Sequence, residues 1–390
     1  MKQTNYARSL VMVVAAVTAV EVLALKPQPM RLADGVTLTP TLDLSEAYDD
    51  NIYEANVVAD SSSWVTTVAP DLLLDVLNGT HHYQLQYSFQ SDFFHSDRDN
   101  DNTDHFFRAG AYLGLDSNNR LDFDASHNRV ENIFDTSVIG ENDKFETTNA
   151  SGVYGFGTAS APFNVDVGVN HTWYRTFNSG GINRDREYDK PGARITGYYR
   201  IAPKTRLLAE YRYDQYDYLL TSSRLDSDKD TLLVGVTWAA TARTLGTLKF
   251  GQERRDFDDN ALDDRDGSSW EADLTWQPAQ RSTLVFNSSK GTDEGSATEE
   301  LIEATRLRVS WNQQLSPRMS SDVFYAYADE DYQDLIGRED EINEFGASVR
   351  YEVARWMDIG LGYTYKDRDS NIPVRAYDRN IFLLKLNLSL

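Results

Sequence analysis

A period-two alternation of apolar and polar residues is the feature that most constrains the fold of this chain. In RWMDIGLGYTYKDRDSN (355–371) and NIFLLKLNLSL (380–390), apolar or aromatic side chains occupy every second position. The same pattern recurs in RLDFDASHN (120–128) and HHYQLQYSFQ (81–90). Successive side chains of a strand point to opposite faces, so this period predicts β-strands. A soluble β-sandwich would alternate as well.

Turn signals divide the chain at nearly regular intervals. Their arrangement decides whether the alternating strands belong to a soluble sandwich or to another all-β fold. They lie near residues 78, 117, 160, 202, 240, 278, 316 and 354, a spacing of roughly 40 residues. Each interval holds two strand-length segments joined by a longer hydrophilic connection, such as HSDRDNDNTD (95–104). Eight short turns and nine long loops would join about eighteen strands between Val36 and Leu390. A propeller with blades of this length needs four strands per repeat, and these intervals hold two, so the pattern argues against a propeller.

The predicted fold is therefore all-β: a transmembrane, antiparallel, up-and-down β-barrel of about eighteen strands, with short periplasmic turns and long extracellular loops. The stretch AEYRYDQYDY (209–218) fits one wall strand of such a barrel. Its charged residues would point into the lumen, Tyr211 and Tyr213 would face lipid, and Tyr216 and Tyr218 would lie near the outer rim. The alternative is that these tyrosines pair across strands in a soluble sheet.

Composition and the N-terminus agree with an exported protein. The formal net charge of −23 argues against nucleic acid as a partner, and the absence of cysteine excludes disulfide scaffolds and thiolate chemistry. A basic start followed by the apolar run Leu10–Val20 predicts a signal peptide within residues 1–33, cleaved between 24 and 33. Residues 34–390 would then form one barrel in the bacterial outer membrane.

Several stretches carry a resemblance to a known family: LSEAYDDNIYEAN (44–56), LAEYRYDQYDY (208–218), DSDKDTLLVGVTWAATARTLGTLKFGQERRDFDD (226–259), SWEADLTWQPAQRSTL (269–284) and YTYKDRDSN (363–371). The chain resembles the outer-membrane β-barrel family called beta-barrel porin type 2, whose members are commonly encoded with capsule or exopolysaccharide operons. The resemblance implies a wide barrel that passes an anionic or neutral polysaccharide chain through the outer membrane. It also implies a periplasmic polysaccharide export protein as partner.

Alternation assigns a set of charged side chains to the predicted lumen. Arg306, Arg308 and Arg350 could form a basic stripe that steers an anionic sugar, or they could pair with Glu344, Asp322 or Asp358 in salt-bridge ladders. The full set of lumen-lining candidates is Arg108, Asp122, Asp124, Asp166, Arg194, Arg200, Glu210, Arg212, Lys249, Glu253, Arg255, Arg306, Arg308, Asp322, Arg350, Asp358 and Lys366.

The long loops carry much of the excess negative charge. Asp97, Asp99 and Asp101 alternate as carboxylates do in a calcium loop, but the central glycine is missing and Arg108 stands where the terminal glutamate belongs. These three aspartates are the candidates for a divalent cation that bridges to lipopolysaccharide. The alternative is that such loops are simply soluble, mutually repelling surface segments.

No enzymatic motif is present in the sequence. The six histidines lie in no zinc-binding or hydrolase pattern, so we expect neither catalysis nor a cofactor. Three functions fit the predicted barrel: export of a capsular or exopolysaccharide chain, a general or substrate-specific diffusion porin for small solutes, and a structural or adhesive surface barrel. A loop folded into the lumen would favour the porin, and Arg129–Thr147 is the candidate for such a loop.

Overall fold

The computed structural model describes residues 29–55, 61–133, 142–158, 160–181, 183–241, 243–294, 301–333 and 337–389. Its long strands are β2 (Val36–Asp49), β3 (Ser63–Asn78), β4 (His81–Phe94), β5 (Asn102–Gly114), β6 (Asn119–Asn132), β7 (Asp143–Phe156), β8 (Phe163–Thr176), β9 (Tyr188–Ala202), β10 (Thr205–Tyr218), β11 (Ser227–Thr241), β12 (Thr244–Phe257), β13 (Arg265–Ala279), β14 (Ser282–Glu294), β15 (Leu301–Ser316), β16 (Met319–Gln333), β17 (Glu339–Ala354), β18 (Met357–Ser370) and β19 (Tyr377–Ser389).

The remaining elements are short. A four-residue strand, β1 (Met30–Ala33), pairs with β2, and the 3-10 turns lie in the connections: η1 (Arg98–Asn100), η2 (Ser179–Gly181), η3 (Arg184–Arg186) and η4 (Pro373–Arg375). Within the described residues, no helix has the length and apolarity that crossing a membrane would require.

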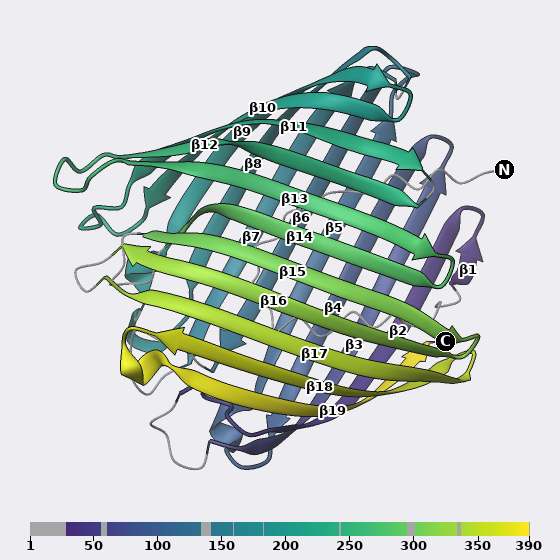
Figure 1. Ribbon diagram of the computed structural model, residues 1–390, viewed down its shortest axis with the longest axis vertical. Coiled ribbons are helices and arrows are strands. Elements are labelled where there is room, and N and C mark those ends of the chain that lie inside the picture. The colour runs from purple at the N-terminus through teal and green to yellow at the C-terminus, as the bar shows by residue number, and fades with distance from the viewer. Residues whose placement is uncertain are drawn as a thin grey trace.

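The eighteen long strands close into a barrel. Each pairs antiparallel with its successor, and β19 returns to pair with β2, from Ile381 opposite Asp49 to Ser389 opposite Thr41. Figure 1 shows the two walls of the barrel crossing in projection, with the yellow β19 and the purple β2 meeting where the sheet closes. The predicted all-β fold and the predicted number of strands are confirmed. Closure matters because it leaves no strand edge unpaired inside a membrane.

The connections fall into two classes at opposite ends of the barrel. Eight short turns connect β3 to β4, β5 to β6, and every further pair up to β17 and β18. They lie at the eight predicted turn positions. At the β3–β4 turn, Gly79 has φ of 61°, a left-handed conformation that glycine adopts without strain. The long connections lie at the other end of the barrel, on the left in Figure 1.

The outer surface is apolar, as a lipid-facing wall requires. Exposed side chains at mid-strand include Val169, Val234 and Phe250, which are 62%, 58% and 61% exposed. Tyr211, on β10, is 44% exposed, in agreement with the lipid-facing position predicted for it. Exposed aromatic residues gather toward the strand ends, as in the aromatic girdles of outer-membrane barrels: Trp64 and Phe93 at the long-loop end, and Phe156, Tyr199, Trp276 and Trp311 at the short-turn end.

Replacing Val169 by lysine is expected to destabilise the barrel by about 2–4 kcal/mol, the cost of a lysine on the lipid face near the membrane midplane. Val169 lies in the middle of β8, on the outer surface. Its neighbour Asn170 faces the opposite side, 3.5 Å from Asp214, so Asn170→Lys would gain a carboxylate partner and should be tolerated. The midpoint of urea unfolding in lipid vesicles measures both effects. Equal loss in the two variants would contradict the assignment of the outer face.

The predicted signal peptide lies mostly outside the described residues, because residues 1–28 are not among them. Met30–Ala33, at the end of the predicted cleavage interval, forms β1 and pairs with the start of β2 across Gly35. The boundary between signal peptide and barrel therefore stays a prediction.

Candidate functional site

The seventeen predicted lumen residues lie on one face of the sheet. On every strand they alternate with the outward apolar or aromatic side chains, as Asp122 and Asp124 do around Phe123, which is 48% exposed. This polar face is the concave one, because its side chains reach strands that are not neighbours: Arg120 on β6 contacts Asp166 on β8 at 2.7 Å. We call it the inner face. That it lines a conducting pore stays a prediction.

Most charged residues of the inner face are paired. Arg108 contacts Asp124 at 2.9 Å, Arg212 contacts Glu271 at 2.5 Å, and Lys249 lies 3.1 Å from Glu210. Glu271 also accepts a contact from Lys249 at 3.0 Å. The residues Glu210, Arg212, Lys249 and Glu271 thus form one network from β10 to β13, near mid-height of the wall. Lumenal charges in this region compensate each other.

The arginines of the predicted basic stripe also have contacts of their own. Arg306 bridges Asp293 at 2.6 Å and Glu330 at 3.0 Å, and Arg350 contacts Asp358 at 3.1 Å. The Arg308 guanidinium lies 3.9 Å from the centre of the Phe324 ring. Of the two interpretations, salt-bridge ladders describe Arg306 and Arg350 better than a free basic stripe does. Asp358 was a predicted partner, whereas Asp293 and Glu330 were not.

One hairpin leaves the wall at the long-loop end. β13 and β14 are paired only as far as Trp270 opposite Lys290. Beyond that point β13 stays with β12, from Ser269 to Arg265, while β14 stays with β15, from Gly291 to Glu294. The end of the β14–β15 hairpin, Gly291–Glu294 with Leu301–Ala304, is therefore not paired with β13 and can leave the plane of the wall. We call it the docked hairpin end.

Polar contacts place this hairpin end on the inner face of β11 and β12. The backbone N–H of Thr292 donates to Glu253 at 3.0 Å, and its carbonyl accepts from Lys229 Nζ at 2.9 Å. Glu253 and Lys229 belong to the inner face of β12 and β11, so the hairpin end passes over β13 on the inside. Leu301 and Ala304 are 0% and 1% exposed, as expected for a segment packed between the wall and its own strand partner.

A buried ion pair fixes the same segment. The Arg255 guanidinium, which is 0% exposed, donates two hydrogen bonds to Glu294, at 2.6 and 3.0 Å, and a third to Ser227 at 2.9 Å. The Tyr218 hydroxyl donates to the same carboxylate, and the Tyr216 ring lies 4.2 Å from the guanidinium carbon. Tyr216 and Tyr218, predicted near the outer rim, thus lie at the long-loop end on the inner face. Such bidentate, fully desolvated pairs are strong only while both partners are present.

A second segment folds inward from the β2–β3 connection. Asn51–Ala55, which we call the strap, follows β2 and crosses to the inner face of β18 and β19. Glu54 accepts from Lys366 at 2.6 Å, from Arg379 at 2.7 Å and from the Tyr377 hydroxyl at 2.5 Å. Glu54 has φ of 47°, a left-handed conformation that is strained in a residue other than glycine. The contacts of its carboxylate compensate for that strain.

The strap and the docked hairpin end approach from opposite walls. β2, where the strap begins, is nine strands from β11 in the ring of eighteen, and β18 and β19, which Glu54 contacts, are seven and eight strands from β11. The strap lies beside β2 over β18 and β19, and the hairpin end lies over β11 and β12. Both are at the long-loop end, so together they narrow the mouth of the barrel from two sides. The predicted inward loop, Arg129–Thr147, continues β6 and β7 at its ends, and its residues 134–141 lie outside the described ones.

Burial alone would raise the pKa of Glu54, but the charges of Lys366 and Arg379, and the hydrogen bond from Tyr377, hold it below its usual value of 4.5. A carboxyl group with a lowered pKa in the folded state stabilises that state above its ordinary pKa. The stabilisation disappears as the pH falls through the lowered value.

Acidification from about pH 7 to about pH 3 is therefore expected to release the strap. Because the chain has no cysteine, a single cysteine at Ala55 can carry a spin label whose mobility reports the release. The label should be immobile at neutral pH and mobile in acid. In the Glu54→Gln background it should be mobile at both values. A label that stays immobile in acid would show that Glu54 does not hold the strap.

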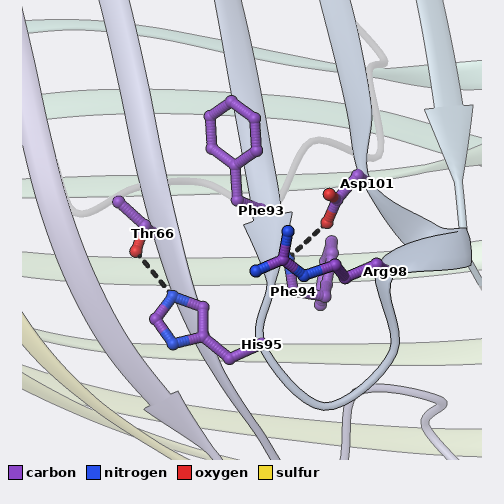
Figure 2. A pocket seen from close by; sticks show the side chains of 6 residues that line it. All are labelled: Thr66, Phe93, Phe94, His95, Arg98 and Asp101. Atoms are coloured by element: carbon purple, nitrogen blue, oxygen red, sulfur yellow. Dashed lines mark hydrogen bonds between the residues drawn. The ribbon is translucent and has the colours of Figure 1, made fainter.

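The loop aspartates are engaged in separate hydrogen bonds. Asp97 caps η1 by accepting from the Asp99 N–H at 3.2 Å and also accepts from the Tyr53 hydroxyl, whereas Asp101 accepts from the Phe94 N–H at 2.7 Å. Figure 2 shows Asp101 at a recess of the rim, across from the Thr66–His95 hydrogen bond. In the part of the chain that the structure describes, no three His, Asp or Glu side chains converge on a possible metal position.

Several residues of the mouth were absent from the predicted set. Arg379 and Asp49 alternate with outward residues of β19 and β2, so the period of the strands could have found them. Glu54 lies in a connection and Glu294 on a strand end that leaves the wall. No sequence period reports such positions.

Solved structures with the same fold are outer-membrane barrels. OccK2 (OpdF) of Pseudomonas aeruginosa matches with a TM-score of 0.50 and 12% identity, over 92% of this chain and 98% of that one. OpdK of the same organism, solved with vanillate, matches with a TM-score of 0.47 and 10% identity, over 90% and 99%. The FrpB iron transporter of Neisseria meningitidis matches with a TM-score of 0.47 and 9% identity over 87% of this chain, which spans 62% of FrpB.

The match to OccK2 (OpdF) supports the fold and nothing finer. No curated protein matches the chain in sequence. The model of the family described as "Putative beta-barrel porin 2" matches residues 35–390, which is nearly the whole chain and all of the closed barrel. The protein therefore belongs to this family of porin-like barrels of the outer membrane.

Proposed function

We propose that the protein is a diffusion channel for small polar solutes. The observation that carries this proposal is the narrowing of the long-loop end by the docked hairpin end and the strap, which approach from opposite walls. An eighteen-stranded barrel has room for an aqueous channel, and segments folded into its mouth limit the size of what can enter. The polar inner face with its paired charges suits hydrated small molecules.

Export of a capsular or exopolysaccharide chain ranks below this proposal. A polymer has to thread past both inward segments, and each is fixed by a buried ion pair that would have to open. The periplasmic export protein, the polysaccharide and lipopolysaccharide as partners stay predictions from the sequence. A structural or adhesive barrel would need no permeable mouth at all.

Conductance of the refolded protein in a planar bilayer, with solute entry into proteoliposomes, tests the proposal. We expect a steady conductance, entry of mono- and disaccharides, and no response to anionic or neutral exopolysaccharide. Transient block of the current by the polymer would favour the export conduit. A protein that inserts but conducts nothing would favour the structural barrel.

A further inference from the structure

Three arginines of the inner face lack the acidic partners that most inner arginines have. Arg108, Arg120, Arg212, Arg255, Arg306 and Arg350 each form an ion pair. Arg194 and Arg200 on β9 and Arg206 on β10 form none with the residues that the structure describes. Unpaired cations are unexpected in a chain with 61 acidic and 38 basic residues. A role in the salt bridges of the wall does not explain these three arginines.

Arg200 and Arg206 are directly opposite each other in the β9–β10 ladder. Like charges at directly opposed positions destabilise a pair of strands, since their Cβ atoms are only about 5 Å apart. Both side chains are half-buried, and the Arg206 guanidinium lies 5.7 Å from the centre of the Tyr198 ring on the same face. The two side chains therefore start from adjacent positions of the same face beside the short turn, where an anion between them would remove their repulsion.

The inner-face carboxylates nearest to Arg200 and Arg206 on the neighbouring strands are bound to other groups. Asp166 on β8 is bound to Arg120 at 2.7 Å, and Glu210 on β10 accepts from Lys249 at 3.1 Å and from the Thr196 hydroxyl at 2.9 Å. Within the described residues, Arg200 and Arg206 therefore have no ion pair that offsets their charge.

Arg194 extends the positive wall toward mid-height. It lies six residues before Arg200 on β9, roughly 20 Å along the strand. Its partner position on β10 is Arg212, whose guanidinium is directed to Glu271. Its partner on β8 is Gly168, where a side chain would come within 3.1 Å of Arg194, so the glycine leaves room for the arginine to lie along the wall. Arg194 is exposed on the inner face.

We propose that Arg194, Arg200 and Arg206 form an oxyanion path along the β9–β10 wall, and that the channel carries small solutes with carboxylate or phosphate groups. Guanidinium groups bind both kinds of oxyanion with paired, charge-assisted hydrogen bonds. The path ends at the Arg200–Arg206 site next to the β9–β10 turn, which gives an entering anion a second position after Arg194. The inference rests on the proposed diffusion channel and names its substrate class.

The test is the reversal potential of the channel in a KCl gradient, followed by addition of succinate. The variant Arg200→Gln/Arg206→Gln should shift the reversal potential toward cation preference and weaken the reduction of current by succinate at least about tenfold, the effect of losing one charge-assisted contact of about 1.5 kcal/mol. The control Arg108→Gln/Asp124→Asn removes an ion pair without changing the net charge. It should leave both quantities as in the unmodified protein.

A second measurement separates a ligand site from a structural one. If the two arginines repel each other, Arg200→Gln/Arg206→Gln should unfold in urea at the same or a higher midpoint than the unmodified protein. A lower midpoint would show that the pair stabilises the barrel and would overturn the proposal. Unchanged selectivity and succinate response in a conducting variant would overturn it too. An unmodified protein that conducts nothing would instead reject the diffusion channel itself.

Discussion

Replacing Glu294 by alanine is expected to release the docked hairpin end and to raise the single-channel conductance. The substitution leaves Arg255 buried without its carboxylate, and loss of one partner of a buried pair costs about 3–5 kcal/mol. At 1.4 kcal/mol per factor of ten, the docked state should lose roughly a hundredfold or more of its advantage. The hairpin end can then swing away from β11 and β12, and water can reach Arg255.

Recordings in a planar bilayer measure this effect, and Glu303→Ala provides a matched control. Glu303 lies on the same hairpin end, opposite Thr292, whereas the carboxylate bound to Arg255 is that of Glu294. Both variants remove one negative charge near the mouth, so a change in local ion concentration affects them alike. Only Glu294→Ala should conduct more. If the two variants conduct alike, the hairpin end does not limit the current, and the observation behind the diffusion channel loses its force.

Replacing Arg379 by methionine is expected to cause a large loss of stability. Arg379, 8% exposed, lies on β19 and donates to Asp49 on β2 at 2.9 and 3.0 Å and to Glu54 of the strap at 2.7 Å. It therefore secures both the closure of the barrel and the strap. Methionine keeps most of the length of the side chain but leaves buried Asp49 without its cation and Glu54 with Lys366 alone. Loss of one partner of a buried pair costs about 3–5 kcal/mol.

The same seam offers a control, because Lys385 on β19 contacts Asp43 on β2 at 3.0 Å. That pair is partly exposed, and partly exposed ion pairs contribute about 0–1 kcal/mol. The urea midpoint should fall strongly for Arg379→Met and little for Lys385→Met. Electrophoresis without boiling gives a second readout, since the closed barrel and the unfolded chain migrate differently. Similar midpoints for the two variants would mean that closure depends on the backbone ladder alone.

The wall of the barrel could be predicted from the sequence because its physics is local. A strand that separates lipid from a polar interior must alternate, and a hairpin turn must interrupt the alternation. The positions of Tyr211 and Phe123 and of the eight short turns follow from these two rules. Family membership was also recognisable, because it depends on the same recurring strand patterns.

The contacts of the inner face could not be predicted in the same way. Alternation places Arg306 on the polar face, but whether its partner is Asp322, Glu330 or Asp293 depends on strand register and on side-chain reach across the concave wall. Unpaired Arg200 and Arg206 look no different in the sequence from paired Arg108. The distinction arises only when every neighbouring carboxylate has been assigned its own partner.

By itself, then, the sequence determined the closed, lipid-facing wall, because successive side chains of every strand point alternately to lipid and to the interior. Only the tertiary structure decided the mouth. The course of Gly291–Glu294 over β13 and of Asn51–Ala55 over β19 depends on contacts between residues as far apart in the chain as Glu54 and Arg379. The contact between Glu54 and Arg379 exists only after the barrel has closed, because closure is what brings β19 beside β2.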